Sequence, residues 1–327
     1  MKRTRSIAGL AFAIASIFAA SSARAELLYG LTEGQQLVTF DSQTRSINSA
    51  VGITGLGGDS LIGIDFRPST GELYGFSSGN RFFKINTATG AATGLGNALL
   101  LIDIVKSFDF DPVNDNIRVL TNQRKNIRVN PNTGAAIAAD SLLNFVAGDP
   151  NAGTTPVVVS GAYTNSYPGA SSSTLFNLES SRNVLTIQSP QNQGKLETVG
   201  EVGLSLGNLL SYRGMDISGQ TGIGYIVGQT LVTGTGLVEN TLYTIDLATG
   251  AIAAAGPITG TPQAGPLTFG GGHTPPLPDP WDCGGIKGAG LLIDVATVPV
   301  PEPSTFILGG FGVVALGLAA RRKLRRL

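Results

Sequence analysis

The sequence predicts an all-β protein, and its repeat pattern favours a five-bladed β-propeller. The 327 residues include 45 glycines and 17 prolines, which are the two poorest helix formers. Apolar runs of about four to six residues alternate with Gly, Asn, Asp and Pro clusters, as expected for short strands joined by tight turns. A block of four such runs then returns along the chain, which indicates a repeat architecture.

Each repeat unit is expected to contain four antiparallel strands. The clearest copies begin at Leu61, Ser107 and Gly214, and an Asn/Asp-x-x-Thr-Gly turn joins the third strand to the fourth. In such a turn the Asn or Asp side chain caps the backbone, and the closing glycine takes a positive φ. The three turns are Asn86–Gly90, Asn130–Gly134 and Asp246–Gly250.

Two further units complete the ring. An irregular unit covers 157–200, and the first unit begins at its second strand, 27–31. We expect Pro266–Phe269 to supply the missing first strand, so that the two ends of the body share a blade. Five closed units describe a propeller, whose closure removes the exposed edge that an open repeat array would present. The alternatives are six blades, if Leu291–Val295 joins the ring, and a β-sandwich with coincidental repeats.

Residues 1–25 have the three parts of a secretory signal peptide. Lys2, Arg3 and Arg5 form the positive start. The apolar stretch Ile7–Ala20 follows, and Ala23 and Ala25 form a small-x-small cleavage site for signal peptidase. The mature chain is therefore expected to begin at Glu26, after export across the inner membrane.

The segment 300–327 also has three parts. The Pro-Glu-Pro triplet Pro301, Glu302 and Pro303 lies in 300–305, before the apolar run Phe306–Ala320 and the basic tail 321–327. As a helix, the 15-residue run spans about 22 Å, which is short of a bilayer core of about 30 Å. Snorkelling arginines can make up the difference, and the basic tail should stay cytoplasmic.

This order of parts resembles a PEP-CTERM sorting signal. Proteins with that tail belong to Gram-negative bacteria that export exopolysaccharide. The resemblance implies that a membrane-embedded exosortase cuts near Pro301, Glu302 and Pro303. We therefore expect a transiently membrane-anchored protein that ends at the cell surface or outside the cell. The alternative is a Pro-rich stalk before an ordinary anchor.

The body resembles a family of exported bacterial proteins catalogued only as a domain of unknown function. The matching stretches are Gly63–Pro68, Leu73–Gly75, Asn130–Gly134, Gly148–Gly153 and Ala162–Asn165. The resemblance covers 28–257 and implies a propeller-like body with no established activity. We accordingly predict a propeller domain over 26–270 and a Pro/Gly-rich spacer over 271–299.

The formal charge differs between the precursor and the exported body. The chain has 22 basic and 22 acidic residues, but nine of the basic residues and none of the acids lie in 1–25 and 304–327. Residues 26–303 therefore carry 13 bases against 22 acids, a formal charge of −9. The scattered bases make nucleic acid an unexpected partner. An acidic body favours cation-bridged matrix contacts over anionic partners.

Three aspartates recur on the first strands of the units, and first strands line the central channel of a propeller. They are Asp65, Asp109 and Asp216. Carboxylates that converge there could bind a cation, or cut a glycosidic bond as an acid/base pair about 5–10 Å apart. Arg67 lies two residues after Asp65, and Asp111 two residues after Asp109. Each is therefore expected on the same face of its strand as that aspartate. The structural alternative is that each Asp accepts hydrogen bonds from turns and neighbouring blades.

Other candidate motifs are weaker. We expect no cofactor, with calcium as the alternative. Asp109–Asp115 is rich in oxygen ligands for calcium, but it lacks the Gly and Glu that an EF-hand has at positions six and twelve. Gly203–Gly207 matches a nucleophile elbow, which requires an α/β sheet that this body lacks. His273 and Cys283 are too few for a metal site.

We therefore expect an exported, exosortase-sorted protein whose propeller is a non-enzymatic binding or structural module. Its partner would be exopolysaccharide or a matrix protein. The alternative is a polysaccharide-acting hydrolase that uses the three recurrent aspartates as its catalytic groups.

Overall fold

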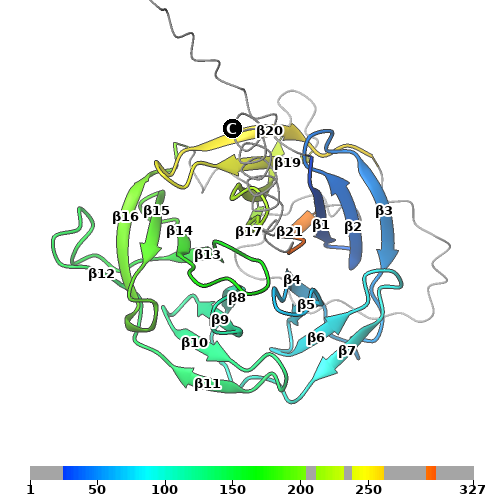
Figure 1. The fold of residues 1–327 in the computed structure, drawn as a ribbon, viewed down its shortest axis with the longest axis horizontal. Coiled ribbons are helices and arrows are strands. Elements are labelled where there is room, and N and C mark those ends of the chain that lie inside the picture. The colour runs from blue at the N-terminus through cyan, green and yellow to red at the C-terminus, as the bar shows by residue number, and fades with distance from the viewer. Residues whose placement is uncertain (1–24, 204–210, 232–237, 261–291, 300–327) are drawn as a thin grey trace, which may run out of the picture.

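The computed structural model describes residues 25–203, 211–231, 238–260 and 292–299. Within these residues, five β-sheets stand around a central axis like the blades of a propeller (Figure 1). The only helical element described is a single turn of 3-10 helix, Gln191–Gln193. The predictions of an all-β fold and of five blades are therefore confirmed, and the described strands form neither of the alternatives, six blades or a sandwich.

Each blade is numbered here from its innermost strand outward. Blade 1 contains β21 (Leu292–Thr297), β1 (Leu27–Thr32), β2 (Gln36–Asp41) and β3 (Ile47–Gly52). Blade 2 contains β4 (Leu61–Phe66), β5 (Leu73–Ser77), β6 (Phe82–Ile85) and β7 (Ala92–Leu95). Blade 3 contains β8 (Val105–Asp111), β9 (Asn116–Thr121), β10 (Asn126–Val129) and β11 (Ala136–Ala139).

Blade 4 has one strand more than the repeat predicts. It contains β13 (Val158–Tyr163), β14 (Leu175–Glu179), β15 (Val184–Gln188) and β16 (Lys195–Glu201), and β12 (Asn144–Phe145) pairs with β16 in parallel. Blade 5 contains β17 (Ser211–Ile217), β18 (Gly224–Leu231), β19 (Val238–Ile245) and β20 (Ile252–Pro257). The other neighbouring strands in every blade are antiparallel, as expected.

The ring closes differently from the sequence-based expectation. We expected Pro266–Phe269 to be the inner strand of blade 1. Those residues lie outside the described ones, and the inner position belongs to β21, which pairs with β1 through Leu28↔Thr297 and Gly30↔Val295. The segment that suggested a sixth blade thus completes the first one, and the range expected to be spacer, 271–299, ends in a propeller strand.

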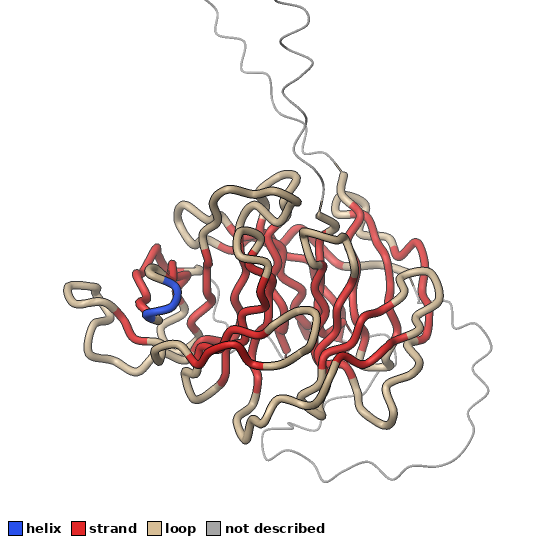
Figure 2. The backbone as a smooth tube through the Cα atoms, turned by 60° about the horizontal axis from the view of Figure 1, so that its bottom comes forward, coloured by secondary structure: helices blue, strands red, loops and turns tan. Residues whose placement is uncertain are grey.

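The five inner strands contact one another in a closed circle. β21 packs beside β4, β4 beside β8, β8 beside β13, β13 beside β17, and β17 beside β21. Figure 1 shows these strands nearest the axis, and Figure 2 shows the stack from a tilted direction. Closure leaves no end blade uncovered, as an open repeat array would, and only the outer strand of each blade keeps a free edge.

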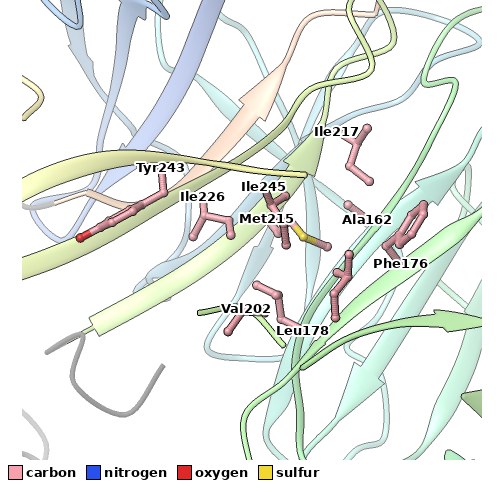
Figure 3. Close-up of a cluster of buried hydrophobic side chains, with 10 residues drawn as sticks. Ala162, Phe176, Leu178, Val202, Met215, Ile217, Ile226, Tyr243 and Ile245 are labelled. Carbon is pink, nitrogen blue, oxygen red and sulfur yellow. The ribbon is translucent and has the colours of Figure 1, made fainter. Parts of the chain in front are cut away.

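The core is divided into five apolar clusters, one at each interface between neighbouring blades. Figure 3 shows the cluster between blades 4 and 5, where Leu178 of β14, Met215 of β17 and Ile245 of β19 meet. The second strands face a neighbouring blade on both sides, so β9 is buried along its whole length. The outer strand β11, in contrast, is mostly exposed.

The turns between third and fourth strands have the predicted geometry. The Asn86 side-chain oxygen accepts the amides of Ala88 and Thr89, both at 3.0 Å, and Gly90 has a φ of 73°. A Cβ on Gly90 would lie 2.1 Å from the Gly52 carbonyl oxygen in the neighbouring blade. Glycine is therefore required both by the backbone conformation and by the contact.

The predictions for the signal peptide and for the sorting segment are not tested by the structure. The signal peptide 1–25, except its last residue, and the whole sorting segment 300–327 lie outside the described residues. Among the described residues, no helix has the length and apolar character needed to cross a membrane. The cleavage positions Ala23 and Ala25 and the expected membrane helix 306–320 stay predictions.

Candidate functional site: a central carboxylate cluster

The recurrent aspartates of three inner strands meet at the propeller axis. Asp65 lies on β4, Asp109 on β8 and Asp216 on β17, each opposite the equivalent residue of its second strand. One carboxylate oxygen from each lies within 4.8 Å of those of the other two. All three side chains are buried. We call Asp65, Asp109 and Asp216 the central carboxylate cluster.

Each carboxylate of the cluster also joins its blade to the next. Asp65 Oδ2 accepts the Phe110 amide of blade 3 at 2.9 Å, and Asp109 Oδ1 accepts the Tyr163 amide of blade 4 at 3.2 Å. Asp216 accepts the Thr297 amide of blade 1. In all three cases the donor amide belongs to the next blade, to the residue that follows the position equivalent to the aspartate. The same contact is therefore repeated at three of the five interfaces between blades.

Alanine occupies the matching position in the other two blades. The strand register places Ala162 of β13 and Ala296 of β21 where the other blades have aspartate. Both alanines are fully buried. Three carboxylates and two methyl groups therefore surround the axis, and the site differs in composition from one blade to the next.

The electrostatics of the cluster are unfavourable without a compensating proton or cation. Burial raises the pKa of Asp216, the amide and hydroxyl of Thr297 and the amide of Ile217 lower it, and the charge of Glu26 raises it. The Ile217 amide donates to Asp216 Oδ1 at 2.7 Å. Like charges this close together in a dry interior disfavour ionisation of all members at once.

Arg67 and Asp111, predicted to share the channel face, serve the blades instead. Arg67 Nε donates to Asp115 Oδ1 at 2.8 Å, and Nη1 donates to the Asn132 side chain at 2.8 Å, which joins blade 2 to blade 3. Asp111 Oδ1 accepts the amides of its own turn. The carboxylates of Asp109, Asp111 and Asp115 thus go to different partners, which argues against a calcium loop within 109–115.

Two buried residues beside the cluster were not recognised from sequence. Glu26 accepts the Ser218 hydroxyl at 3.0 Å and lies close enough to affect Asp216. Thr297 donates its amide to Asp216, and its own hydroxyl is buried without a hydrogen-bond partner of good geometry. Both come from the ends of the body, so no local pattern links them to the aspartates.

The burial of the central carboxylate cluster argues against the hydrolase alternative. The three aspartates are 7%, 4% and 4% exposed, so a polymer chain does not reach them in this structure. Ser205 of the elbow-like motif, His273 and Cys283 lie outside the described residues. The described residues therefore offer buried carboxylates at the axis rather than an open catalytic cleft.

Comparison with known proteins assigns both parts of the chain. A family described as a domain of unknown function, DUF4394, matches residues 23–266. The chain belongs to the DUF4394 family. A second match, the PEP-CTERM protein-sorting motif, covers residues 299–323 and includes Pro301, Glu302 and Pro303. Both resemblances suggested by the sequence are confirmed, and the DUF4394 match ends before β21.

Solved structures add only distant likenesses to this DUF4394 protein. Glutaminyl cyclase of Myxococcus xanthus is 9% identical over 64% of this chain and 83% of its own, with a TM-score of 0.42. The β-propeller domain of Myceliophthora thermophila Cps50 (Swd1) is 11% identical over 70% and 68%, with a TM-score of 0.38. No curated protein matches the chain.

Proposed function

We propose that this DUF4394 protein is a non-enzymatic surface or matrix module that binds exopolysaccharide after exosortase sorting. The observation that carries the proposal is the PEP-CTERM motif at 299–323 joined to a closed β-propeller. The motif implies export and sorting to the surface of a Gram-negative cell. A body delivered there meets the exported polymer first.

Charge and rigidity support a binding role. The formal charge of −9 over residues 26–303 keeps the body soluble and allows divalent cations to bridge it to anionic matrix components. The five interblade clusters fix the framework, while outer strands such as β3, β7 and β11 are partly exposed. A rigid body binds an extended polymer with little loss of its own conformational entropy.

Processing would occur at both ends of the chain. Signal peptidase would cut after Ala25, and exosortase near Pro301, Glu302 and Pro303. Between these events Phe306–Ala320 would anchor the body, with the basic tail in the cytoplasm. The mature protein would then be on the cell surface or in the extracellular matrix, with polysaccharide or matrix proteins as partners and no nucleic acid.

The second candidate is a polysaccharide hydrolase that uses Asp65, Asp109 and Asp216. It is motivated by the convergence of the carboxylates within 4.8 Å. The burial of the cluster and its amide contacts argue against this candidate. Binding without cleavage is therefore preferred.

The two candidates separate in one experiment. The exported protein is mixed with the producer's own exopolysaccharide, binding is measured by co-sedimentation, and the polymer length by size-exclusion chromatography. We expect saturable binding and an unchanged polymer. Shortening that Asp109→Asn abolishes would support the hydrolase, and a polymer that neither binds nor shortens would overturn both candidates.

A further inference from the structure

We propose that the central carboxylate cluster is a structural site for a hard divalent cation of the size of calcium. The proposed ligands are Asp65, Asp109 and Asp216, with Thr297 as an additional oxygen donor. The site goes beyond the proposed function, because it concerns how the propeller is held closed and does not depend on what its surface binds.

The spacing of the carboxylates fits one ion. Calcium takes oxygen ligands at about 2.3–2.6 Å, so two ligands of one ion lie at most about 4.6–5.2 Å apart. The three carboxylate oxygens lie within 4.8 Å of one another. Magnesium, with bonds of about 2.0–2.1 Å, limits the same separation to about 4.2 Å. Without movement of the side chains, the cluster therefore suits calcium better.

Thr297 provides an independent indication of a ligand. Its side chain is 3% exposed, and its hydroxyl has no hydrogen-bond partner of good geometry. The hydroxyl lies beside the Asp216 carboxylate, to which the Thr297 amide donates. An ion beside Asp216 would give this oxygen a partner.

The charge balance around the axis also favours a cation. The nearby arginines Arg67 and Arg118 are engaged with Asp115 and Asp140 respectively. Each carboxylate can accept about four contacts, so the amide hydrogen bonds that these aspartates accept, two in the case of Asp216, do not prevent coordination. Bound calcium would neutralise two of the negative charges that the cluster brings together.

At this position the ion would hold the inner strands of several blades together. Its ligands come from β4, β8, β17 and β21, which belong to blades 2, 3, 5 and 1. Those strands include β21, the last strand of the described body, on which closure of blade 1 depends. Calcium would therefore stabilise the closed ring more than any single blade.

The test uses the full-length protein, purified in detergent, with calcium chloride as the probe. Calorimetric titration should give one ion per chain, and saturating calcium should raise the Tm by at least about 5 °C relative to chelator. Asp109→Asn should weaken binding by more than about 100-fold, and Thr297→Val by about 10-fold. The Asn side chain can still accept the Tyr163 amide, so the fold should persist.

Asp111→Asn is the matched control. Asp111 is buried on the same strand, two residues from Asp109, but its carboxylate caps its own turn. This variant should lose stability and keep the full calcium response. Should Asp109→Asn fail to fold, Asp65→Asn provides the same comparison.

Two results would overturn the proposal. One is a wild-type protein whose Tm and calorimetric signal do not change with calcium. The other is an Asp109→Asn variant whose calcium response is as strong as that of Asp111→Asn.

Discussion

Removing β21 should open the propeller. The strand makes five register pairs with β1, buries Val295 and Ala296, and supplies the amide that Asp216 accepts. Full burial of one Val is worth about 1.5–3 kcal/mol, and each net hydrogen bond about 0.5–1.5 kcal/mol. A buried carboxylate that loses its donor adds about 1–3 kcal/mol. The loss is thus comparable with the whole stability of a typical domain, about 5–15 kcal/mol.

The assay compares two chains that both begin at residue 26 and end at 299 or at 291. Urea unfolding followed by circular dichroism should show a cooperative transition for the longer chain. The shorter one should be unfolded or strongly destabilised, and a peptide of residues 290–299 should restore its transition. The same peptide with Val295→Asp should not restore the transition. Equal urea midpoints for the two chains would refute the assignment of β21 as the closing strand.

Three further outcomes are expected. Gly148→Ala should cost about 1–2 kcal/mol for its positive φ alone, whereas Gly90→Ala should cost about 3 kcal/mol or more in urea unfolding, because its Cβ would also meet a carbonyl oxygen. Equal costs would contradict that contact. The hydrogen bond from Arg67 lowers the pKa of Asp115, so this pair stabilises the fold above the unfolded pKa of about 3.9 and the gain is lost as the pH falls through the lower folded pKa. Asp115→Asn should therefore flatten the decline in Tm below about pH 4, and an unchanged decline would be evidence against the pair. Deletion of Pro301–Pro303 should leave the protein in the membrane fraction, and normal surface release would exclude sorting through this motif.

The local parts of the fold could be predicted because they depend on neighbouring residues. The cap by Asn86 and the positive φ of Gly90 are set within five residues, and the structure has both. The inner strand of blade 1 could not be assigned in the same way. Pro266–Phe269 and β21 are both short apolar runs near the end of the body, and which of them pairs with β1 is decided by tertiary closure rather than by local pattern.

The candidate site also combines residues that the sequence repeat predicts with residues that only the closed ring brings together. A residue that recurs at one position of each unit must return to one level of a propeller, so the convergence of Asp65, Asp109 and Asp216 could be inferred from the repeat. Glu26 and Thr297 are not part of the repeat. They reach Asp216 only because the two ends of the body meet in blade 1. A single sequence contains no signal for such contacts.

Delivery of this propeller to the exopolysaccharide by sorting can be tested in the producing bacterium. The distribution of the protein between membrane, matrix and soluble fractions is measured before and after enzymatic digestion of the polymer. The protein should be in the matrix fraction and become soluble on digestion. Protein that stays in the membrane, or whose matrix attachment survives digestion, would contradict it.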